Sequence, residues 1–177
     1  MNDVDVRIRP AHADDAGWIT ALAPRLHEFG PPPWREVAAM DAAVAAGLAR
    51  ELASPSPGSA ILAAEDASGT PVGFISLRTD RDYFSDAPCG HVTDLVVAGA
   101  GEGRGVGRSL LAAAERWAEE AGYPWLTLHV FEGNDRARRL YEQTGYAVEW
   151  TRMLKSVGAR RAVRSGERPG SDARGEP

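Results

Sequence analysis

The sequence predicts a mixed α/β domain in which a central sheet has antiparallel strands in its N-terminal part, βαβ crossovers behind them and flanking helices. Short segments that alternate apolar and polar side chains interchange with longer segments in which apolar residues recur at helical spacing. Glycine and proline clusters separate these segments. Two strand-like segments are joined by a hairpin connection, whereas later ones are joined through helices, as parallel strands require. Together these three observations predict the fold class.

The N-terminal half is predicted to hold one strand, two helices and a hairpin. The strand ends at Pro10, the first helix stops at Gly30 and the prolines behind it, and Gly69 provides the turn of the hairpin. In order, we expect a strand over 4–8, a helix beginning at Ala13, a helix over 35–52, and strands over 60–65 and 71–78.

The C-terminal half repeats an order of strand and helix. A polar and aromatic loop over 80–88 is followed by a strand, and Gly122 and Gly145 close the two helices as C-terminal caps do. We expect strands over 90–97, 125–131 and 146–154, a helix that begins at the glycine-rich turn near 105, and a helix capped by Asn134.

Composition limits the class of protein. A chain of 177 residues with 44% hydrophobic residues suits one domain. The lone Cys89 cannot form an internal disulfide, and no Cys/His spacing suggests a metal site. No signal peptide or stretch of 18 apolar residues is present, so we expect a cytoplasmic protein that does not span a membrane.

Charge argues against a nucleic-acid partner. The net charge is −5, and residues 155–177 are basic, which leaves −8 on residues 1–154. An acidic body favours a cationic substrate. The last 23 positions contain almost no large apolar side chain, so we expect a domain over 1–154 and a disordered basic tail over 155–177.

The turn Gly101-Glu102-Gly103-Arg104-Gly105-Val106-Gly107 predicts an anion-binding loop. Its glycines allow successive N–H groups to face one concavity, and the positive end of the following helix adds to the same place. No P-loop sequence is present, and neither glycine frame fits the dinucleotide fingerprint. From the residues alone, a tight connection between strand and helix stays an alternative to a pyrophosphate site.

Two motifs together resemble the GNAT superfamily of acetyl-CoA-dependent N-acetyltransferases. The first is Asp94-Leu95-Val96-Val97 followed by the glycine turn, and the second is Asn134-x-x-Ala137-x-x-Leu140-Tyr141. The resemblance covers about 72–154 and implies a single-domain GNAT-like fold that takes acetyl-CoA as acetyl donor, needs no metal and acts on an amine. Members of this family often form homodimers, so a homodimer is a further expectation.

The resemblance also implies which residues bind the cofactor. The strand before the turn offers main-chain groups to pantetheine, the turn holds the pyrophosphate, and the second motif completes the site. Carried onto this sequence, the cofactor-binding residues are Leu95, Val96, Val97, Gly103, Arg104, Gly105, Val106, Gly107, Arg108, Ser109, Asn134, Ala137 and Tyr141.

Glu102 departs from the pattern, because the family most often has Gln or Arg at this position. A carboxylate repels a pyrophosphate, so we expect Glu102 to turn away or to pair with Arg104 or Arg108. The main-chain cradle does not depend on this side chain.

The catalytic residues implied by the resemblance are Tyr141 and His91. Tyr141 would protonate the thiolate, and a backbone N–H of Val96 or Val97, freed by a bulge, would face the thioester oxygen. His91 lies at a strand position that holds a base in some members. Asp94 competes with it, but alternates to the opposite face unless a bulge intervenes.

Other groups are weaker alternatives for the base and for the acceptor site. Glu28 or a chain of waters could take the proton, whereas Cys89 has only His91 near it in sequence as an activating partner for a nucleophilic role. The family places its acceptor near the first helices and the loop before the cofactor strand. The substrate candidates there are Glu28, Trp34, Tyr83 and Phe84.

Two other functions stay open at this point. A module that binds acyl-CoA without catalysis would account for Glu102, and a nucleotide-binding regulatory domain would use the basic tail on nucleic acid. The expected function is transfer of an acetyl group from acetyl-CoA to a primary amine of a small molecule, peptide or protein, by direct attack in a ternary complex.

Overall fold

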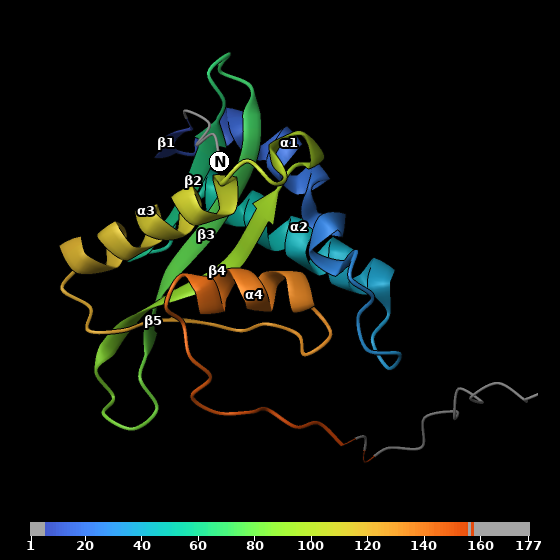
Figure 1. Ribbon diagram of the computed structural model, residues 1–177, viewed down its shortest axis with the longest axis vertical. Coiled ribbons are helices and arrows are strands. Elements are labelled where there is room, and N and C mark those ends of the chain that lie inside the picture. The colour runs from blue at the N-terminus through green and yellow to red at the C-terminus, as the bar shows by residue number, and fades with distance from the viewer. Residues whose placement is uncertain (1–5, 156, 158–177) are drawn as a thin grey trace, which may run out of the picture. The chain divides into compact units, whose positions relative to one another are not determined.

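The computed structural model of the chain describes residues 6–155 and 157. Two compact units divide at residue 147, and every helix and strand of the described residues lies in the first of them, up to Ala147 (Figure 1). The strands are β1 (Arg7–Pro10), β2 (Ser59–Glu65), β3 (Pro71–Arg81), β4 (Pro88–Val97) and β5 (Leu126–Leu128). The helices are α1 (Ala16–Ala21), α2 (Val37–Ala53), α3 (Val106–Glu120) and α4 (Asp135–Gln143), with short 3-10 turns η1 (Ala13–Asp15), η2 (Ala23–His27) and η3 (Gly99–Gly101).

One five-stranded sheet organises the first unit, in the order β1-β2-β3-β4-β5. The first three pairings are antiparallel, and β4 pairs with β5 in parallel, with α3 as the crossover between them. The predicted mixed α/β class is therefore confirmed, and one βαβ crossover is present among the described residues.

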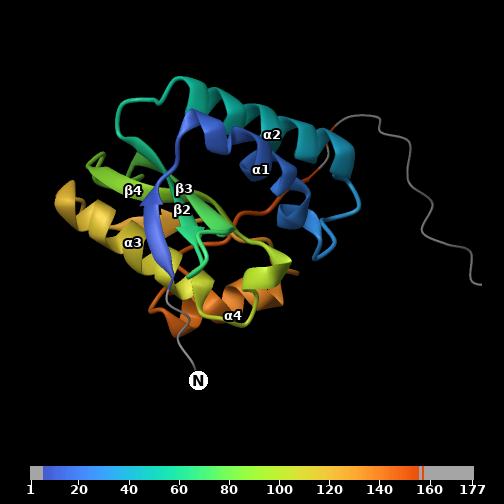
Figure 2. The ribbon, with the colours of Figure 1, turned by 90° about the horizontal axis from the view of Figure 1, so that it is seen from above.

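Helices cover both faces of this sheet. Figure 2 shows α1 and α2 on one side and α3 and α4 on the other. Alternation along β3 supplies both cores, because Phe74 packs with Ile19 of α1 whereas Ile75 packs with Leu110 and Leu111 of α3. These five side chains are almost fully buried, and burying each one contributes about 2 kcal/mol to the stability of the folded state.

The N-terminal elements differ in detail from the prediction. Residues 1–5 lie outside the described part, and β1 begins at Arg7. The helix expected from Ala13 is divided into η1, α1 and η2. Pro24 lies in the first turn of η2, and its missing N–H and its ring do not allow α1 to continue through it.

The C-terminal end differs most. The expected strand over 125–131 is only three residues long in β5, and the expected strand over 146–154 is wrong, because no residue from 146 to 155 is in a strand. An alternating pattern forms a strand only when a neighbouring strand accepts its hydrogen bonds. The second predicted crossover is therefore absent, and most of the predicted tail, 155–177, lies outside the described residues.

No helix in the described ranges is long and apolar enough to cross a membrane.

Candidate active site

The parallel pairing of β4 and β5 ends early. The last paired residues are Val92 and Leu128, although β4 continues to Val97. From Thr93 onward, the side of β4 that faces β5 therefore has no strand partner among the described residues. A cavity of about 720 Å³ opens there, and its wall includes every residue from Val92 to Val97.

A bulge in β4 sets which side chains enter this cavity. Leu77 pairs with Val92 and Ser76 pairs with Asp94, so Thr93 is an extra residue without a partner on β3. The bulge places Asp94 on the same face of the sheet as His91. Asp94 therefore meets the condition for competing with His91 as the base, which was that a bulge intervenes between them. The bulge lies at Thr93 and not at Val96 or Val97, where it was expected.

The glycine-rich turn forms the next wall of the cavity. Gly103 and Gly105 have φ values of +69° and +81°, which residues with a Cβ rarely adopt. Gly105 is the N-cap of α3, so the first N–H groups of the helix have no partner within it. A Cβ on Gly107 would lie 3.0 Å from Cδ2 of Leu140, so the glycine also lets α4 pack closely.

Helix α4 closes the cavity from the other side. The Asn134 side chain accepts a hydrogen bond from the Ala137 N–H at 3.1 Å and caps the helix, as expected of an Asn at this position. This cap fixes the first turn of α4 beside the glycine turn. Ala137, Leu140 and Tyr141 then line the cavity along one helical face.

Glu102 bridges two arginines that the sequence did not identify. Its carboxylate forms ion pairs with Arg25 of η2 and, at 2.9 Å, with Arg136 of α4, rather than with Arg104 or Arg108. Hydrogen bonds from Arg136, followed by the charges of both arginines, hold the pKa of Glu102 below its usual value. Arg25 Nε also donates to the Val97 carbonyl at 3.0 Å. The four residues therefore join η2, the end of β4, the turn and α4.

Arg104 and Arg108 have other partners. Arg104 donates to the Ala100 carbonyl at 3.1 Å, and Arg108 donates to the side chain of Gln143. Both still line the cavity.

Asp94 and Tyr141 are the titratable side chains of the cavity with strongly shifted pKa values. Burial raises the pKa of Asp94 to about 6, and the charges of His27 and Arg78 oppose this shift. Burial, with a further contribution from Asp94, raises the pKa of Tyr141 to about 12. At neutral pH Asp94 can therefore accept a proton and Tyr141 can donate one.

His91 is buried and does not line the cavity. Its Nδ1 lies 2.8 Å from the Thr127 hydroxyl, which itself donates to the Gly90 carbonyl, so the ring links β4 to β5. Burial, with the charges of Arg78 and His129, lowers the pKa of His91 to about 4. Its role as base stays a prediction, and the geometry favours Asp94.

The other predicted residues divide into two groups. All the expected cofactor residues except Ser109 line the cavity, and so does Glu28. Trp34 lies in a second cavity, whereas Tyr83 and Phe84 are about 80% exposed and line neither. Cys89 is buried, which raises the pKa of its thiol and does not support a nucleophilic role.

The donor set of the cavity fits an elongated molecule with a diphosphate. Free N–H groups of the turn and the start of α3 suit the phosphates, and the unpaired edge of β4 suits an amide-containing arm. Arg25 and Arg136 add positive charge at the same end. No cluster of three His, Cys, Asp or Glu side chains that could hold a metal occurs within 6–155 and 157.

Solved structures of acetyltransferases share this fold. A putative acetyltransferase from Pyrococcus furiosus superimposes with a TM-score of 0.70 at 20% identity, over 86% of this chain and 100% of the other. An aminoglycoside N-acetyltransferase in complex with CoA gives a TM-score of 0.67 at 19% identity, over 89% and 98% of the two chains.

Sequence relatives support the same assignment. An uncharacterized N-acetyltransferase, YhfO of Bacillus subtilis, is 33% identical over 80% of this chain and 89% of its own length. Mycothiol acetyltransferase of Nocardiopsis dassonvillei is 30% identical over 81% of this chain, which spans only 43% of that protein. The Acetyltransferase (GNAT) family profile matches residues 23–146. The chain therefore belongs to the GNAT family and is an acetyl-CoA-dependent N-acetyltransferase.

Proposed function

We propose that the chain acetylates the primary amine of a small molecule or peptide by direct attack on acetyl-CoA within a ternary complex. The observation that carries this proposal is the unpaired edge of β4, which lies beside the glycine turn, Asp94 and Tyr141 in one cavity. Acetyl-CoA, when bound, supplies an activated thioester. The chain's own residues bind, orient and move protons.

Binding depends mainly on the backbone. N–H groups of residues 103–108 are available to the pyrophosphate, and the main-chain groups of Leu95 and the N–H of Val97 on the open edge are available to the pantetheine amides. An N–H of β4 beyond the Thr93 bulge faces the thioester oxygen in this arrangement and stabilises the charge that develops there.

Two side chains move protons. Asp94 accepts the proton that the ammonium group of the acceptor must lose before its nitrogen can attack. The C–N bond then forms, the C–S bond breaks, and the Tyr141 hydroxyl donates its proton to the departing thiolate. The nitrogen of the new amide loses its remaining extra proton, which restores the Tyr141 hydroxyl. With its lowered pKa and its bond to Thr127, His91 supports the strand pair beneath this site.

Thiol release on mixing the protein with acetyl-CoA and a panel of polyamines, aminoglycosides, amino acids and peptides tests the proposal. Release that depends on an amine supports it. Tight acetyl-CoA binding with no release by any amine would instead support a cofactor-sensing module. A cytoplasmic location and a homodimer stay predictions.

Asp94→Asn removes the proposed base and keeps the size of the side chain. We expect kcat/KM at neutral pH to fall by roughly 10²-fold. In the unmodified protein kcat/KM is expected to rise as the pH increases through about 6, because only the carboxylate form of Asp94 accepts a proton. The variant is expected to lack this acidic limb.

The pH–rate profiles of Asp94→Asn and His91→Asn distinguish the two candidate bases. Loss of the limb in His91→Asn, with its retention in Asp94→Asn, would show that the histidine takes the proton.

Tyr141→Phe removes the proposed proton donor. We expect kcat to fall by roughly 10²-fold with little change in the dissociation constant of acetyl-CoA, because the hydroxyl acts on the departing sulfur. Tyr146→Phe is the matched control, since the Tyr146 hydroxyl is buried next to the Tyr141 ring and has no hydrogen-bond partner in the described structure. Equal turnover of the two variants in the thiol-release assay would remove Tyr141 from the mechanism.

Glu102→Gln frees Arg25 and Arg136 for the phosphates of the cofactor. We expect acetyl-CoA to bind roughly fivefold more tightly, which corresponds to one exposed ion pair. Calorimetric titration measures this change, and Glu119→Gln at the exposed end of α3 is the control. Weaker binding in Glu102→Gln would mean that the carboxylate serves chiefly to position the arginines.

A further inference from the structure

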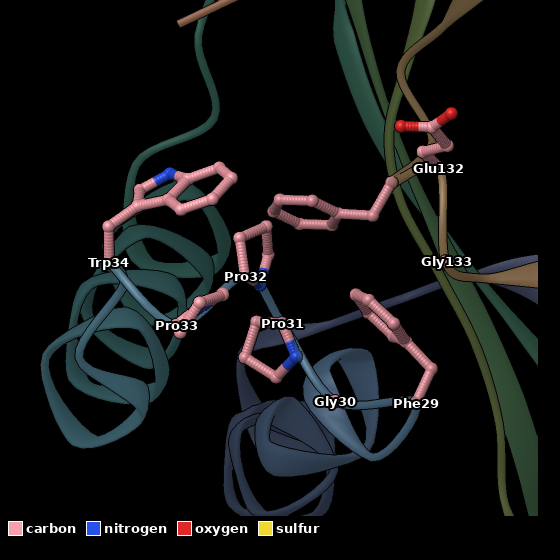
Figure 3. A pocket seen from close by; sticks show the side chains of 9 residues that line it. Phe29, Gly30, Pro31, Pro32, Pro33, Trp34, Glu132 and Gly133 are labelled. Atoms are coloured by element: carbon pink, nitrogen blue, oxygen red, sulfur yellow. The ribbon is translucent and has the colours of Figure 1, made fainter. Parts of the chain in front are cut away.

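A second cavity, of about 450 Å³, is separate from the residues that hold the cofactor. Figure 3 shows its walls, which come from residues 29–34, between η2 and α2, and residues 131–133, between β5 and α4. Both segments connect elements that also bound the cofactor cavity.

The two cavities meet at a pair of aromatic rings. Phe29 and Phe131 line both of them, and their ring centroids lie 5.3 Å apart with an interplanar angle of 35°. Glu28, the neighbour of Phe29, is exposed and lines the cofactor cavity. A molecule in the second cavity therefore lies at the boundary of the space that contains Asp94.

The chemistry of the second cavity is apolar and rigid. Three successive prolines, Pro31, Pro32 and Pro33, have fixed φ values and no N–H to satisfy, so this wall is preformed. In Figure 3 the Trp34 ring lies across the opening from Phe29. Flat aromatic faces and proline rings favour a flat apolar group over a hydroxylated one.

Charge at the cavity is negative. Glu132 is the one charged residue among the described residues of its wall, whereas the Glu28 carboxylate near the boundary already pairs with Arg25 at 3.3 Å. Arg25 and Arg136, which line the cofactor cavity, both pair with Glu102. This arrangement attracts an ammonium group and repels a carboxylate.

We propose that the second cavity binds the body of the acceptor, and that the acceptor is a small primary amine joined by a short linker to an aromatic ring, without a carboxylate. The proposal rests on the proposed acetyl transfer, because the amine must extend past the Phe29 and Phe131 rings to reach Asp94. It assigns Trp34 and Glu132 as residues that determine specificity.

Calorimetric titration of the protein saturated with CoA tests the proposal directly. 2-Phenylethylamine is expected to bind at least tenfold more tightly than propylamine, which lacks the ring and so buries less apolar surface. It is also expected to bind at least tenfold more tightly than phenylalanine, which adds a carboxylate, and than kanamycin, which lacks an apolar body.

Trp34→Ala is expected to weaken the binding of 2-phenylethylamine by roughly fivefold to tenfold. Trp125→Ala is the matched control, because Trp34 and Trp125 are 53% and 61% exposed and only Trp34 lines the cavity. Glu132→Gln is expected to reduce the discrimination between 2-phenylethylamine and phenylalanine.

The outcomes separate this inference from the proposed function. Propylamine or kanamycin binding as tightly as 2-phenylethylamine, or equal effects of Trp34→Ala and Trp125→Ala, would overturn the inference. A tripeptide with an N-terminal phenylalanine that binds more tightly than 2-phenylethylamine would overturn the small-molecule assignment. Ring-dependent binding without thiol release would support the second cavity as the site for the aromatic ring and would contradict the proposed acetyl transfer. Thiol release with no preference for a ring would support the acetyl transfer and contradict the assignment of the second cavity.

Discussion

The separation of β4 from β5 after Val92 and Leu128 is the constraint on which the site depends. A central strand normally has hydrogen-bonded neighbours on both sides, because unpaired backbone groups are costly to bury. Among residues 6–155 and 157, no strand pairs with the C-terminal part of β4 on one side, and the cavity lies along that side. The open edge explains why an amide-containing cofactor arm fits there, since such an arm replaces the missing strand.

Charge and burial then divide the cavity into two ends. At the end near the glycine turn, Glu102 holds Arg25 and Arg136 in place, and a phosphate group competes with that carboxylate for both. At the other end the Thr93 bulge places Asp94 where burial raises its pKa to about 6, in the same cavity as the proposed proton donor Tyr141. In the proposed mechanism, phosphate binding and proton transfer therefore occur at different ends of the same open strand edge.

The elements that the sequence predicts correctly are those with a local cause. The glycine turn, helix α3 and the Asn134 cap each follow from neighbouring residues, and the family resemblance is confirmed. Features that depend on distant residues are not predicted. Arg25 and Glu102 are 77 positions apart, so no local pattern indicates their pairing. The Thr93 bulge depends on the register between β3 and β4. A strand over 146–154 would need a neighbouring strand to pair with, and the alternation of its own residues does not show whether one is present.

Hydrogen exchange of backbone amides, measured with and without saturating acetyl-CoA, tests whether the open edge of β4 binds the cofactor. Peptides that cover residues 93–97 and 103–108 are expected to exchange more slowly in the presence of the cofactor, because its amides and phosphates bond to those main-chain groups. The β2–β3 turn over 66–70 is expected to exchange at the same rate in both states. Saturating binding that leaves 93–97 unprotected would contradict the assignment of the open β4 edge as the cofactor site.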